Sequence, residues 1–489
     1  MTRFGRSSES LDQLMTDAAT LAMENAGLDR IDAIYIGIMN VEEFVGDSNI
    51  ATVLVDALGL SGTPSTRVET ASSTGAGVFQ AAFYAVASGH MKNVLVLAGE
   101  KMTHLPTVKA TRILSEVIDR SERRYGATMP ALAAMIAQRY AQEARLTISQ
   151  FEEILAQVAI KNYANGTHNP LAQFKKAIER DDYLKSPMVS YPLRIHDCAP
   201  ISDGAAAVIL TAQPAPIRVS GIGHATDTSA VRHRASLTSF NSTREAAVKA
   251  YTMAQVNPSD IDFAEVHDAF TPFEIIGTED LGFFPSGAGW KAVEDGTTQA
   301  LGKLPVNPSG GLKARGHPIG ASGLAQIIEI IWQLRGDAGE DRQLERAEIG
   351  LAQSIGGLGN NNLVTILERT DRKKTKSEGW KLTYHPEIKP SRKPATPEPR
   401  QGIGILETFT ILHATPEGFR SPLALGFVKT EVGERILACN PDYRSPKDLK
   451  IGGKVNLIPK EGLYVFEKAT LMGRVKELLR PSPKSREKD

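Results

Sequence analysis

The chain has 489 residues, 42% of them hydrophobic and 23% charged, which is the composition of a globular protein rather than a disordered or fibrous one. At about 150 residues per domain, this length predicts roughly three domains with large buried cores. Lys plus Arg and Asp plus Glu number 56 each, so the net charge is zero. A neutral surface argues against nucleic acid or an anionic membrane as the partner.

The cysteines and the N-terminus exclude further classes of protein. The two cysteines, Cys198 and Cys439, are far apart in the sequence. They exclude a disulfide scaffold and a Cys-rich zinc or iron–sulfur site, so no metal is expected. No apolar run is long enough to cross a membrane, and residues 1–14 lack the apolar core of a signal peptide. We therefore expect a soluble, cytoplasmic protein.

Residues 1–102 alternate between helix-like and strand-like patterns. Apolar side chains recur at helical spacing over 11–26 and stop before Gly27. The last strand of this region is continuously apolar, as strands buried on both faces are. The alternation predicts an α/β fold with a parallel or mixed sheet. The expected elements are a helix at 11–26, a strand at 32–39, helices at 48–58 and 78–89, and a strand at 94–102.

A second series of the same kind follows a Pro-rich break at 213–216. Asn241, Ser242 or Thr243 is available as the N-cap of its first helix. The two series share a strand–turn–helix rhythm with little residue identity, which favours an internal duplication. The expected elements are a strand at 217–223, a helix at 241–254, a strand at 261–266, an amphipathic helix at 321–336, and two strands joined by a Gly-rich turn over 348–369.

The composition changes near Arg369, where basic residues and prolines begin. Such a segment is typical of a solvated linker, and the neutral overall charge favours a linker over a nucleic-acid patch. Short strands then follow at a spacing that predicts a small β-barrel. These strands are expected at 403–412, 423–430, 435–439 and 454–458. The expected divisions are an N-terminal half at 1–213, a C-terminal half at 214–369, the linker at 370–400, the barrel at 401–478 and a flexible tail at 479–489.

Three Gly-rich turns, at residues 69–77, 307–323 and 353–359, hold candidates for chemistry. In the first, residues 69–77, Ser72 lies near the N-terminus of the expected helix, where free backbone N–H groups and the helix dipole favour developing negative charge. An N-cap role for Ser72, or for its neighbours Ser73 and Thr74, is the simpler alternative. The third turn, residues 353–359, could present backbone N–H groups as an oxyanion hole or be a plain hairpin turn.

Two histidines are candidates for acid–base work. His317 stands between a glycine and a proline in the second turn, residues 307–323, where little side-chain cover surrounds it. A lone histidine is more often structural, but the neighbouring glycines favour one that reaches into a site. His267 is paired with Asp268 at the end of an expected strand, which is where sites form in α/β sheets. The alternative is a solvated surface pair.

Together, the order and spacing of these segments resemble the thiolase superfamily, and within it the sterol-carrier-protein-type and archaeal-type thiolases, over about residues 2–368. The matching stretches include VETASSTGAG, HDCAPISDGAAAVIL, EVHDAF and NPSGGLKARGHPIGASG, of which the last is highly specific. Residues 402–467 resemble the OB-fold module that accompanies thiolases of this type. The resemblance implies a duplicated five-layer α/β thiolase fold, a small C-terminal OB-fold barrel, and a homodimer or homotetramer.

The resemblance also implies roles for single residues. Family members use a cysteine nucleophile at the start of a buried helix, and this position falls on Ser72. His317 is then the histidine of the GHP motif that activates the nucleophile. His267 belongs to the HDAF motif and takes the place of an asparagine that orients a water in an oxyanion hole. Ser354 occupies the position of the second cysteine, which moves a proton in catalysis.

Substrate contacts are implied as well. The backbone N–H groups of Ser72 and Gly356 would form the other oxyanion hole, and Asn307 and Gly357 complete the expected substrate-binding set. Ala269 stands where sterol-carrier-type thiolases have a catalytic cysteine, so no cysteine is placed for catalysis. Coenzyme A or an acyl-CoA is the expected substrate.

A serine nucleophile changes the expected chemistry, because a hydroxyl offers no anion comparable to a thiolate and needs a base acting in concert. The resemblance favours an acyl-CoA acyltransferase that forms a carbon–carbon bond, or cleaves one by thiolysis, next to a CoA thioester, with Ser72 acylated and His317 as base. One alternative is a lyase of the same fold that performs decarboxylation, retro-Claisen or retro-aldol cleavage without a covalent intermediate. Another is a non-catalytic scaffold that binds acyl-CoA.

Two departures concern the ends of the matched regions. Family members usually carry an apolar strand before the segment that begins at Thr2. We therefore expect either that this strand is absent or that the start of the amino-acid sequence is set too late. OB-fold modules of this type often follow a zinc ribbon of four cysteines, and the expected linker contains no cysteine.

Overall fold

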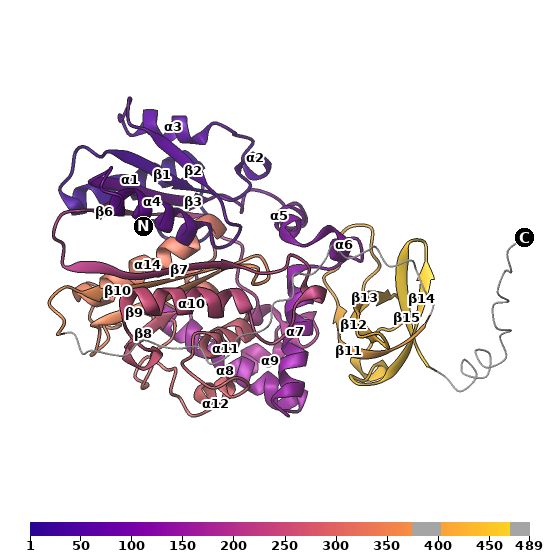
Figure 1. Cartoon of the computed structure of the whole chain (residues 1–489). Coiled ribbons are helices and arrows are strands. Elements are labelled where there is room, and N and C mark those ends of the chain that lie inside the picture. The colour runs from indigo at the N-terminus through magenta and orange to yellow at the C-terminus, as the bar shows by residue number, and fades with distance from the viewer. Residues whose placement is uncertain (374–401, 470–489) are drawn as a thin grey trace, which may run out of the picture.

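The computed structural model describes residues 1–373 and 402–469. Two four-stranded sheets face each other with the central helices α4 (Thr74–Ala87) and α14 (Ile319–Arg335) between them. Further helices cover the outer face of each sheet, as Figure 1 shows. Helices and sheets thus form the five layers of the expected α/β fold.

The two sheets repeat one pattern. Their strands, in order across each sheet, are β2 (Ser65–Val68), β1 (Ala33–Gly37), β3 (Asn93–Glu100) and β6 (Gly204–Thr211) in the first, and β7 (Ile217–Thr226), β10 (Asn361–Arg369), β9 (Ile349–Gly356) and β8 (Phe263–Glu265) in the second. β1 runs parallel to β3, which is antiparallel to β6; β8 runs parallel to β9, which is antiparallel to β10. Helix α4 precedes β3 and α14 precedes β9, which confirms the predicted duplication.

Local signals end the outer helices where the sequence predicts. Ser10 caps α1 (Leu11–Ala26), which covers the first sheet, and Gly27 closes it at φ 63°. The helix that covers the second sheet, α10 (Asn241–Ala254), has the predicted bounds. The nonpolar Phe240 stands at its N-cap position, so the three expected caps lie inside the first turn instead. The other helices of the two halves are α2 (Val41–Phe44), α3 (Ile50–Ala57), α11 (Thr271–Asp280), α12 (Gly289–Glu294) and α13 (Gly311–Arg315).

A helical insertion separates β3 from β6, and the patterns considered above predict none of its helices. Two local signals in it could have been read. Thr128 caps α7, which has proline in its first turn, and Thr147 with Gln150 forms a capping box at the start of α8. The elements of the insertion are α5 (Thr107–Leu114), α6 (Arg120–Arg123), α7 (Met129–Glu143), α8 (Ile148–Thr167), α9 (Arg180–Lys185), β4 (Met188–Ser190) and β5 (Leu193–Arg194).

Residues 402–469 form a closed five-stranded barrel, which confirms the predicted small C-terminal barrel (Figure 1). The strands are β11 (Gly402–Leu412), β12 (Leu423–Thr430), β13 (Arg435–Asn440), β14 (Lys454–Lys460) and β15 (Leu463–Lys468). Going around the barrel, β11 pairs with β12, then come β13, β15 and β14, which returns to β11. The sequence patterns missed β15, although Glu461 and Gly462 before it have φ of 50° and 78°, the signature of a tight hairpin turn.

The barrel packs on the helical insertion. β11 pairs with β4 through Leu412 and Ser190, and the Thr408 hydroxyl donates to the carbonyl oxygen of Met135 at 2.7 Å. Buried side chains of the barrel, of α7 and of α8 form one hydrophobic cluster. The predicted linker and tail fall almost entirely outside the described residues, so these divisions stay predictions. No helix in the described part of the chain is long and apolar enough to span a bilayer.

Candidate active site

The first turns of the two central helices approach closely because a glycine stands at their crossing. A Cβ atom added to Gly75 of α4 would lie 2.8 Å from the carbonyl oxygen of Gly320 and 2.5 Å from the backbone nitrogen of Leu324, both in α14. A side chain larger than a hydrogen atom would prevent this backbone approach. The crossing brings the segment of Ser72, which precedes α4, beside the segment of His317, which precedes α14.

Ser72 has a free hydroxyl at the start of α4. Its side chain is only 7% exposed and makes no hydrogen bond with the described residues. The neighbouring hydroxyls hold the turn, because Ser73 donates to the Thr70 carbonyl at 2.7 Å and Thr74 accepts from the Thr70 N–H at 2.9 Å. No side chain caps α4, so Ser72 does not have the capping role considered above. Ala71 before it has φ 55°, a left-handed strain that is typically retained at functional sites.

The third Gly-rich turn reaches the same helix start. A Cβ atom added to Gly356 would lie 2.6 Å from the Thr70 carbonyl oxygen and 2.7 Å from the Ser73 hydroxyl. Gly356 therefore lies against the turn that carries the candidate nucleophile. Ser354, which precedes it in β9, is 1% exposed and donates its hydroxyl to the Gln326 side-chain carbonyl at 2.7 Å. The hydroxyl of Ser354 is thus already committed to α14.

The imidazole of His317 is held in one orientation. Its Nδ1 lies 2.7 Å from the hydroxyl of Ser322, which also lies 2.9 Å from the carbonyl oxygen of Pro318. A carbonyl can only accept, so the hydroxyl proton goes to Pro318 and the Nδ1–H of His317 donates to Ser322. This assignment, made from the hydrogen-bond partners, leaves a lone pair on Nε2. His317 is thereby prepared to act as a base through Nε2.

His267 lies next to His317. Their ring centroids are 5.2 Å apart and the rings are nearly perpendicular. His267 is 1% exposed and Asp268 is fully buried, so the alternative of a solvated surface pair is wrong. The backbone N–H of His267 donates to the Gln353 side-chain carbonyl at 3.0 Å, while the ring Nδ1 is buried with no partner among the described residues. The structure therefore brings the two predicted histidines together.

Both histidines are kept neutral. Burial, and then the positive charges of Arg315 and Lys313, lower the pKa of His317 to about 3. Burial, then the neighbouring His317 and Arg315, holds the pKa of His267 well below its usual range. Lys313 is itself fully buried, and its ammonium has no hydrogen-bond partner within the described residues. At physiological pH both imidazoles are thus neutral donors or acceptors rather than cations.

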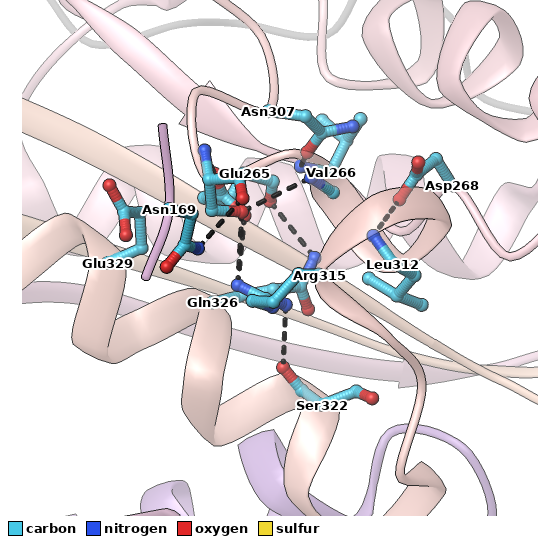
Figure 2. Close-up of polar contacts among 12 residues, drawn as sticks. Asn169, Glu265, Val266, Asp268, Asn307, Leu312, Arg315, Ser322, Gln326 and Glu329 are labelled. Atoms are coloured by element: carbon cyan, nitrogen blue, oxygen red, sulfur yellow. Dashed lines mark hydrogen bonds and ion pairs between the residues drawn. The ribbon is translucent and has the colours of Figure 1, made fainter. Parts of the chain in front are cut away.

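Asp268 ties the strand end of His267 to the segment of His317. One carboxylate oxygen accepts from the Leu312 N–H at 2.6 Å, as Figure 2 shows, and the other accepts from the Asn162 side chain at 2.8 Å. Leu312 lies at the start of the short helix α13, which ends two residues before His317. Burial and the nearby Glu274 raise the pKa of Asp268 to about 6. The carboxylate thus caps the helix that leads to His317.

A buried ion pair supports the same segment from the other side. Arg315 lies 3.3 Å from a carboxylate oxygen of Glu265, and it also contacts the carbonyl oxygen of Ser322 at 3.5 Å (Figure 2). Ser309 donates to Glu265 at 2.7 Å. Burial raises the pKa of Glu265 to about 7, against the opposing effect of Arg315. Because the hydroxyl of Ser322 also orients His317, Ser322 connects the ion pair to the imidazole.

Asn307 and Gly357 have structural constraints of their own. The Asn307 side chain accepts from the Val266 N–H at 2.9 Å, so its amide holds the end of β8 (Figure 2). It also donates to Glu274 at 2.8 Å. Asn307 also has φ 58°, which fits an asparagine in the turn. Gly357 has φ 60°, and an added Cβ would lie 2.5 Å from Asn360. Whether either touches a substrate stays a prediction.

Several members of this network were missing from the sequence predictions. Asn162 and Glu274 come from α8 and α11, far from either histidine in the chain, and no local pattern connects them to the site. Ser322 lies in the second Gly-rich stretch itself and could have been read as a helix-borne partner of His317. Burial raises the pKa of the Cys198 thiol to about 12, so no thiolate replaces the missing cysteine there. Within the described residues, no cluster of His, Cys, Asp and Glu side chains could hold a metal ion.

Comparison with protein families and known proteins gives consistent matches. Residues 1–214 match the family described as "Thiolase, N-terminal domain", and residues 223–369 match "Thiolase C-terminal domain-like". An acetyl-CoA acetyltransferase of Methanothermobacter thermautotrophicus is 42% identical over 381 residues, which cover 75% of this chain and 97% of that protein. The benzoylsuccinyl-CoA thiolase subunit BbsB of Thauera aromatica is 35% identical over 346 residues, or 68% of this chain and 87% of that protein.

A solved structure extends the likeness in fold to nearly the full length of the chain. The monomeric SCP2-thiolase-like protein type 1 from Mycobacterium smegmatis covers 96% of this chain and 98% of its own, with a TM-score of 0.74. At 16% identity, this likeness concerns the fold alone.

Proposed function

Because the chain belongs to the thiolase family, we propose that it is an acyl-CoA acyltransferase that forms or cleaves a carbon–carbon bond next to a CoA thioester, with Ser72 in the position of the nucleophile. One observation carries this proposal. Three segments that are remote in sequence, those of Ser72, His317 and Gly356, converge on the start of α4. A helix N-terminus beside an oriented imidazole is suited to acyl transfer.

In the proposed step, Nε2 of His317 takes the hydroxyl proton of Ser72 as the serine oxygen attacks the thioester carbon. The backbone N–H groups of Ser72 and Gly356 would bind the oxyanion that forms. Coenzyme A then leaves as a thiol with the proton from His317, and the acyl group stays on the serine. A second acyl-CoA, deprotonated next to its thioester, would attack the acyl-serine; the bond from the acyl carbon to the Ser72 oxygen breaks, the serine oxygen takes up the abstracted proton, and the condensed product is released. His267 and Ser354 are the candidates for that second proton transfer.

A second function, a lyase of the same fold, is favoured by a specific observation. The pKa of His317 is about 3, and an imidazole of that basicity is a weak base for a serine hydroxyl. A neutral His267, whose ring lies 5.2 Å from that of His317, can instead donate a hydrogen bond to a thioester oxygen as it becomes an enolate. Decarboxylation or retro-Claisen or retro-aldol cleavage would then proceed without acylation of Ser72.

The remaining expectations belong to the same proposal. The five-stranded barrel, with β13 and β15 parallel and the other neighbours antiparallel, supports its assignment as an OB-fold module. Its docking on the insertion supports a role close to the thiolase-type site rather than in nucleic-acid binding. We propose a cytoplasmic homodimer or homotetramer with CoA or acyl-CoA as the small-molecule partner and without a metal.

Intact-protein mass spectrometry after incubation with acetyl-CoA tests the proposal. We expect an acetyl adduct on the wild type that is lost in Ser72→Ala and kept in the matched control Ser73→Ala, whose hydroxyl is already bonded to Thr70. Turnover that survives in Ser72→Ala would establish the lyase instead. A protein that binds acyl-CoA without adduct or turnover in any form would be the scaffold. Gain of ordinary thiolase activity in Ser72→Cys would show that the rest of the site is competent.

A further inference from the structure

One buried cation lies outside the steps described above. Arg234, in the loop between β7 and α10, is 3% exposed, and its Nε, Nη1 and Nη2 have no hydrogen-bond partner within the described residues. A guanidinium carries five N–H donors and keeps its charge at neutral pH. Burying such a group without an acceptor is strongly unfavourable. The guanidinium therefore calls for an acceptor from outside the described residues.

The carboxylates whose charges act on Arg234 accept hydrogen bonds from other groups. These are Asp227, which accepts the Thr228 N–H at 2.7 Å, and Glu122; neither is bonded to the guanidinium nitrogens of Arg234 in the described part of the chain. Glu122 accepts the N–H groups of Val231 at 3.1 Å and Arg232 at 2.8 Å. Burial lowers the pKa of Arg234 to about 10, which still leaves it charged at pH 7. Its charge is thus available to a further anion.

A row of aromatic rings connects Arg234 to the candidate active site. The guanidinium lies over the Phe240 ring, 5.7 Å from its centroid. Phe240 meets Phe273 edge to face at 5.0 Å, and Phe273 meets Phe270 in the same way at 5.3 Å. Phe270 is three residues after His267. Arg234 therefore stands at the far end of an apolar wall whose near end is the segment of the catalytic histidine pair.

The same wall also meets the Gly-rich turn. A Cβ atom added to Gly359 would lie 2.5 Å from the Phe240 ring, so this ring packs directly on the turn that starts at Gly356. An apolar wall with one convergent charge is the usual construction of a small-molecule site. The wall suits an acyl chain, and the guanidinium suits a planar anion at its end.

We propose that Arg234 binds a carboxylate at the far end of the acyl group, so that the preferred substrates are CoA thioesters of dicarboxylic acids. The inference rests on the proposed function, because the CoA thioester must occupy the site near His267. A carboxylate matches the guanidinium fork with two parallel hydrogen bonds. The phosphates of CoA are a poorer match, since one cation that is 3% exposed could neutralise only part of their charge.

Isothermal titration calorimetry of the full chain with succinyl-CoA and isocaproyl-CoA tests this inference. The two thioesters have nearly the same shape, and the carboxylate of succinyl-CoA is replaced by an isopropyl group in isocaproyl-CoA. We expect the wild type to bind succinyl-CoA at least about tenfold more tightly. Arg234→Met should weaken the binding of succinyl-CoA by roughly thirtyfold. The same variant should bind isocaproyl-CoA as tightly as the wild type does, or more tightly.

The matched control is Arg342→Met. Arg342 is also buried but already has a carboxylate partner, Glu329, so the ratio of the two affinities should stay at the wild-type value. Thermal unfolding of each variant reports on folding. Arg234→Lys provides a second variant, which keeps the positive charge but loses the two parallel N–H donors of the guanidinium. It should weaken the binding of succinyl-CoA alone, and by less than Arg234→Met does.

Three results would overturn the inference. Equal affinity of the wild type for the two thioesters would remove the carboxylate preference while the proposed function stands. Equal weakening of both thioesters and of free CoA in Arg234→Met would assign the cation to a CoA phosphate. Absence of binding by free CoA and by both thioesters would contradict the proposed function itself, and the inference with it.

Discussion

The two central helices begin at two differently built halves of the candidate site. At the start of α4, hydroxyls bond to backbone groups of their own turn, as Ser73 and Thr74 do with Thr70. At the start of α14, the supporting groups are charged and buried, and they come from distant elements, as the pair of Arg315 and Glu265 illustrates. Both helices nevertheless sit in corresponding places of a duplicated fold.

This difference separates a local from a long-range construction. The turn before α4 is held by hydrogen bonds to its own main chain, so its conformation depends little on the rest of the molecule. A change of side chain at Ser72 therefore leaves the backbone of this turn in place. Buried charges are stable only while every partner stays in position, and removal of one partner leaves the other unpaired. The histidine side should therefore respond to substitutions much more strongly than the serine side.

The largest expected effect is at His317 itself. In His317→Ala the imidazole that serves either proposed reaction is lost, and turnover of the thioester should fall by about a thousandfold, within the usual range for a positioned acid–base group. A steady-state assay of CoA release measures this loss. The control is His224→Ala, which removes an exposed histidine bonded to Asn361. Retention of more than about a tenth of the turnover in His317→Ala would remove this residue from the mechanism.

An intermediate effect is expected from the carboxylates at the two ends of β8. Asp268 accepts the Leu312 N–H after the strand, and Asp262 accepts the N–H groups of Glu348 at 2.9 Å and Ile349 at 3.1 Å before it. Both Asp→Asn variants should lower the free energy of unfolding by about 1–3 kcal/mol, because each weakens buried hydrogen bonds to backbone N–H groups. Only Asp268→Asn should lower kcat, by about ten- to a hundredfold at similar KM.

Denaturant unfolding and steady-state kinetics of the two variants separate these expectations. A second change, Gly311→Ala, acts on the same contact, because an added Cβ would lie 2.4 Å from the Asp268 carboxylate. It should lower kcat in the same way as Asp268→Asn. If Asp262→Asn lowers kcat as much as Asp268→Asn does, the effect is one of stability, and Asp268 is not a positioning residue.

The smallest effect concerns protonation. Lys313→Met removes a positive charge that disfavours the imidazolium of His317, so the pKa of His317 should rise above its value of about 3. It should stay below 6.5, the usual value, because burial is the larger cause. The pH at which His317 begins to be protonated thus moves upward in the variant, and any acid loss of activity that depends on it moves in the same direction.

Nuclear magnetic resonance titration of labelled histidine side chains measures this shift. The wild-type His317 signal should not titrate between about pH 8 and pH 5, because its pKa lies well below that range. Lys249→Met, which removes a lysine at the protein surface, is the control and should leave the signal as it is in the wild type. A His317 signal that titrates near pH 6.5 in the wild type would contradict the burial of this imidazole.

Elements with strong local signals were predictable from the sequence. The bounds of α10 and β12 agree with the prediction, because amphipathic spacing and bounding turn residues are local properties. The Gly-rich turns were found for the same reason. The helical insertion and β15 escaped, although a capping box and a tight hairpin turn marked some of their ends. These elements were missed because their local capping and turn signals were not recognised, and not because such signals are absent.

The tertiary structure alone decided how the candidate residues are related. The sequence by itself determined which residues are candidates for chemistry, Ser72 and the two histidines, and it predicts that no cysteine is placed as a nucleophile. It could not determine that Asp268 is buried or that Asn162, 106 positions away, is its partner. Nor could it show that Arg234 is buried with no hydrogen-bond acceptor among residues 1–373 and 402–469. The pKa of a side chain and the partners of a buried charge depend on atoms brought together by folding, and no spacing along the chain encodes them directly.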